Sequence, residues 1–326
     1  MEARIPGSWT RRIDVLSRVA ERLYWMARYL ERAENNARMI MAFNSLALDM
    51  PRETQLSWKG LVAVTGMGAL FDQHHQKADE RNCVKFLMAD SYNPSSIASC
   101  IKAARENVRT TRDQVPTDAW EVINELYRYI QEYIDQGVGK RARYDFLNEI
   151  VGRCQMLNGL LAGCMSHDEG YDFIRVGRNL ERADMATRQI EVGALQFLDG
   201  WDGTETYGGL LWTSVLRYQS AFQMYRHNVR RKVSGPLVIR FLLQNEPFPR
   251  SVLHSLSEVA GALGRLPRNE IPLRTALQAV RHTREGDVDA LIRKEDVILF
   301  LENLQLEIGE LHDDIAETWF PVYETA

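Results

Sequence analysis

The sequence contains the stretch Arg28-Tyr-Leu-Glu-Arg-Ala-Glu-Asn-Asn-Ala-Arg38, and a close copy recurs as Arg178-Asn-Leu-Glu-Arg-Ala-Asp-Met-Ala-Thr-Arg188. The second copy starts 150 residues after the first (178 minus 28), and Glu34 of the first is answered by Asp184 of the second. Both copies lie in long segments without proline, where apolar residues recur at helical spacing. We therefore expect two equivalent helices, each carrying one Glu-Arg motif.

The charges of the motif form a pattern of their own. On a helical wheel the apolar residues of the first copy gather on one face, with Glu34 and Arg38 at its edge and Glu31 just beyond. Arg28 and Arg32 fall on the far side, four residues apart, where like charges repel by roughly a few tenths of a kcal/mol. The second copy repeats this stripe of cations with Arg175, Arg178 and Arg182. A repulsive pair that occurs twice calls for an anionic partner.

Two kinds of partner fit this pattern. If the two copies pack about a pseudo-twofold axis, Glu31 meets Arg182 and Glu181 meets Arg32. If the arginines face outward, their partner is a phosphate, a carboxylate substrate or an acidic protein surface. Both alternatives stay open at this stage. The candidate binding residues of the two motifs are Arg28, Glu31, Arg32, Glu34, Arg38, Arg175, Arg178, Glu181, Arg182, Asp184 and Arg188.

Other landmarks recur in the same order at nearly the same offset. Trp58 is matched by Trp212 at an offset of 154, and Pro94-Ser-Ser96 is matched by Pro249-Arg-Ser251 at an offset of 155. We therefore predict an all-α protein, a duplicated helical bundle with internal pseudo-twofold symmetry. The expected parts are an N-terminal extension (1–14) and two helical repeats (15–165 and 166–326) that together form one compact domain.

Helix boundaries follow from apolar spacing and from the proline and glycine breaks. We expect a first helix over 17–49, a second over 55–71, and the second motif helix over 168–197. A later helix bears Trp212 and runs into a basic cluster, and the last helix spans 288–319. No segment shows convincing strand character.

Composition gives no support for a nucleic-acid-binding, membrane-spanning or metal-dependent protein. The 326 residues carry a net charge of −4, which gives no signal for nucleic acid or for an anionic membrane surface. No apolar run reaches the roughly 18 residues of a membrane span. The four cysteines include no CxxC pair, which favours reduced, buried thiols and a cytoplasmic protein. No histidine has the Glu-x-x-His spacing of a di-iron bundle, so neither a metal nor a cofactor is predicted.

The opening from Leu16 to Arg38 resembles that of the bacterial Alpha-E family, an all-helical family named for its Glu-Arg motif. The segments Leu180-Glu-Arg-Ala-Asp184 and Phe248-Pro-Arg-Ser-Val252 match it as well, whereas the first fourteen residues do not. The resemblance implies association with circularly permuted ATP-grasp ligases and transglutaminase-like proteins, which are encoded beside or fused to such proteins. It thus implies a pathway that makes or modifies peptide-like amide bonds, and it assigns no catalytic residue.

A second charged feature is a basic cluster at a predicted helix C-terminus, consisting of Arg226, Arg230, Arg231 and Lys232. Cations are favoured there by the helix dipole, and the functional alternative is the docking of an acidic partner.

The leading interpretation is an accessory, non-catalytic helical protein of an ATP-grasp-linked system, which binds a protein partner or an anionic small molecule. The alternative is an enzyme with its site between the motif helices. In that case Glu31, Glu34, Glu181 and Asp184 act as acids and bases, and the arginines clamp the substrate.

Overall fold

The computed structural model describes residues 8–50, 56–197, 207–288, 290 and 294–320, and in these the chain forms 14 helices and no strand. The all-α prediction is therefore confirmed. The helices of the first half are α1 (Ser8–Asp49), α2 (Lys59–Val64), α3 (Gly68–His74), α4 (Glu80–Met88), α5 (Ile97–Thr110), α6 (Thr117–Val138) and α7 (Arg143–Cys164). Those of the second half are α8 (Glu169–Phe197), α9 (Gly208–Tyr218), α10 (Phe222–Val229), α11 (Gly235–Gln244), α12 (Val252–Leu263), α13 (Glu270–Glu285) and α14 (Lys294–Trp319).

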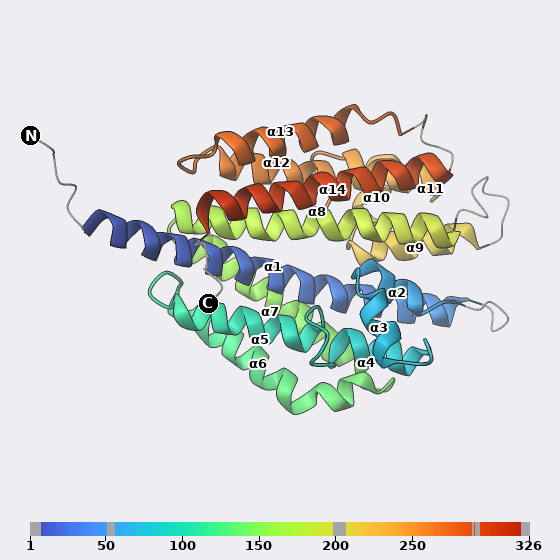
Figure 1. Cartoon of the computed structure of the whole chain (residues 1–326). Helices are drawn as coiled ribbons and strands as arrows, with labels where there is room; N and C mark the ends of the chain where they lie inside the picture. The colour runs from blue at the N-terminus through green and yellow to red at the C-terminus, as the bar shows by residue number, and fades with distance from the viewer. Residues whose placement is uncertain (1–7, 51–55, 198–206, 289, 291–293, 321–326) are drawn as a thin grey trace, which may run out of the picture.

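The two motif helices, α1 and α8, lie side by side through the middle of the molecule and run in the same direction (Figure 1). Helices α5 and α7 pack on α1, with α6 against both, while α12 and α14 pack on α8, with α13 against both. Helix α9 also packs on α1, and α2 on α8. Each central helix is thus covered on several sides, which buries polar motif residues together with apolar ones.

Capping and apolar spacing explain the helices that flank the central pair. The hydroxyl of Ser96 accepts a hydrogen bond from the Ser99 backbone N (3.2 Å) at the start of α5. The hydroxyl of Ser251 does the same for the His254 backbone N (3.1 Å) at the start of α12. Such caps satisfy a backbone donor that the helix leaves free. The buried residues of α5 follow helical spacing and are Ile97, Cys100, Ile101, Ala104 and Val108.

Two predicted helices are broken in the structure. The helix expected over 55–71 is instead α2 and α3, separated at Gly66, whose φ is +71°. The helix expected from Trp212 to the basic cluster is α9 and α10, separated at Ser220, whose φ is +52°. A residue with positive φ cannot continue a right-handed helix, so the chain turns at both points. Glycine signals such a turn, but serine does not.

The ends of two other helices also differ from those expected from the sequence. Helix α1 begins at Ser8, so half of the expected extension is helical, although the side chains before Ser17 lie outside the described set. The last helix begins at Lys294, later than expected. No described helix is long and apolar enough to cross a membrane. All four cysteines are free, and Cys164 is exposed, contrary to the expectation that every thiol is buried.

The two central helices approach closely at Gly177 of α8. A Cβ added at Gly177 would collide with the backbone carbonyl of Tyr24 on α1, whereas one added at Gly152, in the middle of α7, meets no atom within 4 Å. Glycine at position 177 is therefore needed for the contact between the helices rather than for the helix itself.

We expect Gly177→Ala to lower the free energy of unfolding by about 1–3 kcal/mol, because the added methyl group forces α1 and α8 apart. The matched control, Gly152→Ala, should be neutral or raise stability by about 0.5–1 kcal/mol, because alanine favours the helix. Urea unfolding of both variants measures the difference. Equal stabilities would mean that the helices do not touch at this point.

Candidate functional site

Glu31 of α1 is fully buried and is bound by two arginines, one from α8 and one from the segment before α12. Arg182 of α8 donates through Nε to Oε1 (3.0 Å) and through Nη2 to Oε2 (2.8 Å). Arg250, just before α12, donates through Nη1 to Oε1 (2.9 Å). Fork-to-fork pairing of a guanidinium with a carboxylate is the strongest form of such an ion pair. We call this group the Glu31 site.

Glu181 of α8 has the reciprocal arrangement and is also fully buried. Arg32 of α1 donates through Nε to Oε1 (2.5 Å) and through Nη2 to Oε2 (3.0 Å). Arg28, one turn earlier, donates through Nε to Oε2 (2.7 Å). We call this group the Glu181 site. The internal pairing considered from the sequence, Glu31 with Arg182 and Glu181 with Arg32, is therefore present.

The helical wheel misplaced some of these residues. It set Arg28 on the side away from the core, but only 8% of its side chain is exposed. Its Nη1 donates to Tyr24 Oη (3.1 Å), which shares a hydrogen bond with His312 Nδ1 of α14 (2.8 Å). Burial, with the charge of Arg28, lowers the pKa of His312 to about 4, so this imidazole is neutral. The wheel failed because α1 has neighbours on several sides.

Arg250 is the residue that sequence reasoning missed. Besides Glu31, it binds Glu34, with Nη2 donating to Oε1 (2.6 Å), and it donates to Asn35 Oδ1 (3.0 Å). Glu34 also accepts from Arg38, four residues along the same helix. A signal was present, because Arg250 is the central residue of Phe248-Pro-Arg-Ser-Val252, but its role depends on a contact 219 residues away in the chain.

The second stripe of cations is divided among different partners. Arg175 binds Glu258 of α12 (2.6 Å). Arg178, although mostly buried, forms no ion pair with any described residue, and its Nε has no hydrogen-bond partner. Burial, together with the charge of Arg182, lowers the pKa of Arg178. The second guanidinium at Glu31 comes from Arg250 and not from Arg178, although Arg28, the counterpart of Arg178, binds Glu181.

The electrostatics hold both central carboxylates in the ionised form. Burial alone raises the pKa of Glu31, but the charges of Arg182 and Arg250 outweigh it and bring the pKa to about 2. Arg32 and Arg28 do the same for Glu181, whose pKa is also lowered to about 2. Neither group can hold a proton at neutral pH.

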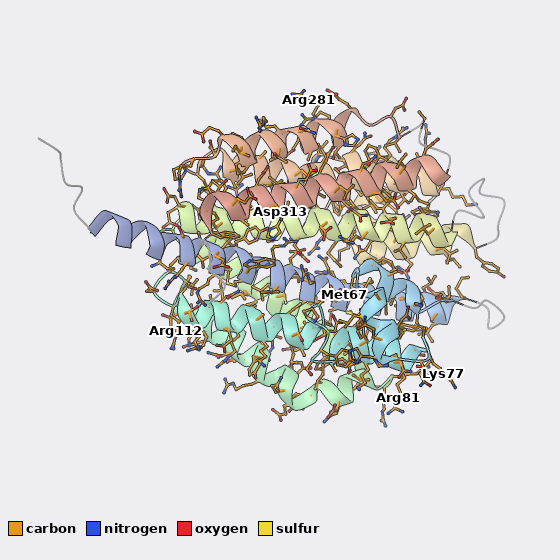
Figure 2. The ribbon with its side chains drawn as sticks, in the orientation of Figure 1. Met67, Lys77, Arg81, Arg112, Arg281 and Asp313 are labelled. Carbon is orange, nitrogen blue, oxygen red and sulfur yellow. The ribbon has the colours of Figure 1, made fainter. Side chains whose placement is uncertain are left out.

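A pocket of about 260 Å³ reaches the Glu181 site from the surface. Glu181 and Arg32 lie at its inner end, and Asp184 and Arg188, which pair with each other (2.9 Å), form one wall. Met67, which lies between α2 and α3, also lines this pocket and is labelled in Figure 2. The motif side chains thus interlock and also line a pocket.

The predicted basic cluster lies on the surface at the end of α10. Its members Arg226, Arg230, Arg231 and Lys232 are all exposed. Arg230 caps the helix in a left-handed conformation (φ +52°), and Arg231 also lines a shallow pocket of about 630 Å³. Within the described residues, no group of three or more histidine, cysteine or acidic side chains could hold a metal ion.

Comparison with known proteins agrees with this architecture. A family model described as a predicted alpha-helical domain with a conserved ER motif matches residues 15–320. The chain belongs to the Alpha-E family. In this chain the sequence Glu-Arg occurs in both central helices, as Glu31-Arg32 of α1 and Glu181-Arg182 of α8.

Among curated proteins, uncharacterised proteins of Mycobacterium bovis and Mycobacterium tuberculosis are each 23% identical over 268 residues. The match covers 77% of this chain and 30% of each relative, so the chain spans about a third of their length. A protein of a second M. tuberculosis strain is 22% identical over the same length. No solved structure matches.

We expect Glu31→Gln to lower the free energy of unfolding by about 3–5 kcal/mol, because the change leaves Arg182 buried without a counter-charge and leaves Arg250 with Glu34 alone. The matched control is Glu149→Gln in α7, which breaks an exposed pair with Arg153 and should cost less than about 0.5 kcal/mol. Chemical unfolding of both variants makes the comparison. A loss below about 1 kcal/mol for Glu31→Gln would show that the buried pair is not a structural contact.

The same pair predicts a pH dependence. The pKa of Glu31 is about 4.5 when unfolded and about 2 when folded, so the unfolded chain binds more protons between these values. The stability from this pair is fully present above pH 4.5 and is lost as the pH falls towards 2. The difference in unfolding free energy between wild type and Glu31→Gln should therefore shrink over that interval. A constant difference would contradict a lowered pKa.

Proposed function

We propose that this chain is a non-catalytic helical component of an ATP-grasp-linked system that makes or modifies peptide-like amide bonds. The twin motifs join its two halves, and a protein partner docks on its surface. The partner in this proposal is a circularly permuted ATP-grasp ligase or a transglutaminase-like protein. Family membership supports that choice, and the four free thiols are consistent with a cytoplasmic setting.

One observation carries the structural role of the motifs. Glu31 and Glu181 are fully buried, and each is bound by two arginines. A general acid or base must reach its substrate and exchange a proton near the working pH. Neither carboxylate can exchange a proton near neutral pH, because the pKa of each is lowered to about 2, and this weighs against the alternative of an acid–base enzyme centred on them.

We infer further that the two halves arose by duplication, with α1–α7 equivalent to α8–α14. The breaks at Gly66 and Ser220 lie 154 residues apart, and both have positive φ. The capping serines Ser96 and Ser251 lie 155 residues apart. Each half has four long helices packed in the same order, and each motif glutamate binds arginine from the other half.

The relatives support a role beside other domains. Only 30% of each mycobacterial relative matches this chain, so the shared domain is joined there to much more sequence. A helical unit that can be part of a longer chain needs a face for its neighbours. The exposed cations at the end of α10 offer such a face for an acidic surface.

The test is a pull-down with a circularly permuted ATP-grasp ligase from the same genome, with and without ATP. Arg230→Glu combined with Arg231→Glu should weaken association at least about tenfold, because the steering charges are reversed, and should leave melting nearly unchanged. The control, Arg274→Glu with Arg281→Glu, makes the same change of charge at two exposed residues of α13 and should bind normally. Arg281 is labelled in Figure 2.

Failure of the wild-type chain to associate with the ligase would contradict the proposed function. Equal binding by both double variants would keep the partner but remove the basic cluster from the interface. In that case the helix dipole alone accounts for the cluster.

A further inference from the structure

Under the duplication inferred above, two positions that carry longer side chains at the Glu31 site carry shorter ones at the Glu181 site, where the pocket lies. At the Glu31 site, Arg250 lies against both acids, and Ser220 Oγ accepts a hydrogen bond from Arg38 Nη1 (2.6 Å). In the duplicated halves, the position of Arg250 is taken by Ser95, and that of Ser220 by Gly66. Both line the pocket of about 260 Å³.

The missing side chains leave an acid without its second donor. Glu34 accepts hydrogen bonds from both Arg38 and Arg250. Its equivalent, Asp184, accepts only from Arg188 Nε at Oδ1, and its Oδ2 has no donor among the described residues. Under the duplication inferred above, the space beside Asp184 corresponds to the space that the guanidinium of Arg250 fills beside Glu34.

With Ser95 and Gly66 at these positions, some guanidinium nitrogens of the Glu181 site also lack an acceptor among the described residues. Arg38 Nη1 has the Ser220 hydroxyl, and Arg182 Nη1 has the Pro249 carbonyl (3.3 Å). Their equivalents are Arg188, whose two Nη atoms have no acceptor in the described part of the chain, and Arg32, whose Nη1 has none there either. A Cβ at Gly66 would lie only 3.4 Å from Arg188 Nη1, where the serine of the other half stands.

We propose that this pocket binds a free α-amino acid. Its ammonium group takes the place of Arg250 and donates to Asp184, and its carboxylate accepts from Arg188 and Arg32. The assignment rests on the duplication inferred above, because the other half shows which groups the pocket lacks. A free amino acid carries both charges on adjacent carbons, and amino acids are substrates of amide-bond synthesis.

Ligands with a single charge satisfy only part of the pocket. An anion such as phosphate would set negative charge against the carboxylate of Asp184. An amine alone would leave the free Nη donors of Arg188 and Arg32 without an acceptor and would add a cation where two arginines already balance two acids. Access is open, because 33% of the Arg188 side chain and 16% of that of Asp184 are exposed. The volume lies just below the range of drug-sized sites, which suits a small ligand.

The experiment is calorimetric titration of the purified full chain with L-alanine and with its two single-charge fragments, propionate and ethylamine. L-Alanine should bind, and each fragment should bind at least about tenfold more weakly, because each satisfies only one side of the pocket. A series of other α-amino acids then shows which side chain the pocket prefers.

Three variants locate the binding. Arg188→Gln should weaken alanine binding at least about tenfold, whereas Arg38→Gln, the same change at the Glu31 site, should leave it unchanged. Ser95→Arg introduces the residue that the other half carries and should abolish binding by filling the pocket. The backbone of Ser95 makes its hydrogen bonds with Asn93 and Asn36, so this substitution keeps them.

Absence of binding by every α-amino acid tested would overturn the inference. Propionate binding as tightly as L-alanine would show a simple anion site, and ethylamine doing so would show a cation site. Equal loss in Arg188→Gln and Arg38→Gln would place the ligand elsewhere. Ligase association is measured separately, so its failure with intact alanine binding would contradict only the partner proposal.

Discussion

The contact on which the structure depends is the reciprocal ion pairing of α1 and α8. Glu31 of α1 binds Arg182 of α8, and Glu181 of α8 binds Arg32 of α1, so each helix supplies one glutamate and one arginine to the interface. Each carboxylate is fully buried and needs more than one cation to offset the cost of leaving water. The flanking bundles supply the dry surroundings, and Arg250 comes from one of them.

The Glu31 site and the Glu181 site differ in the origin of their second arginine, and the pocket lies at the Glu181 site. Arg250 closes the Glu31 site from outside the motif, while Arg28 completes the Glu181 site from within it. Arg178, the equivalent of Arg28, therefore has no carboxylate among the described residues, and its pKa is lowered. Arg250 thus closes the Glu31 site, whereas the Glu181 site is reached by a pocket lined with polar groups.

The sequence predicted the architecture better than the site. Repetition of the motif raised the pairing of Glu31 with Arg182 as one of two alternatives, and the contacts between α1 and α8 decided between them. Burial of Arg28 could not be predicted from its own helix, because it depends on α14 and on Tyr24. The role of Arg250 and the turn at Ser220 likewise depend on contacts between distant parts of the chain.

The ion pairs between α1 and α8 restrict the register in which the two helices can pack. Two parallel helices with apolar faces could slide by one turn and still bury much of their surface, whereas a fork-to-fork pair has one register. A shift by one turn would bring Arg182 beside Asn35 in place of Glu31 and would strand both charges in the interior. Gly177 allows the helices to approach closely, and the ion pairs of the Glu31 and Glu181 sites determine which residues meet at that distance. The same register places Asp184 and Arg188 opposite Gly66 and Ser95, so the geometry of the pocket follows from the pairs that hold the halves together.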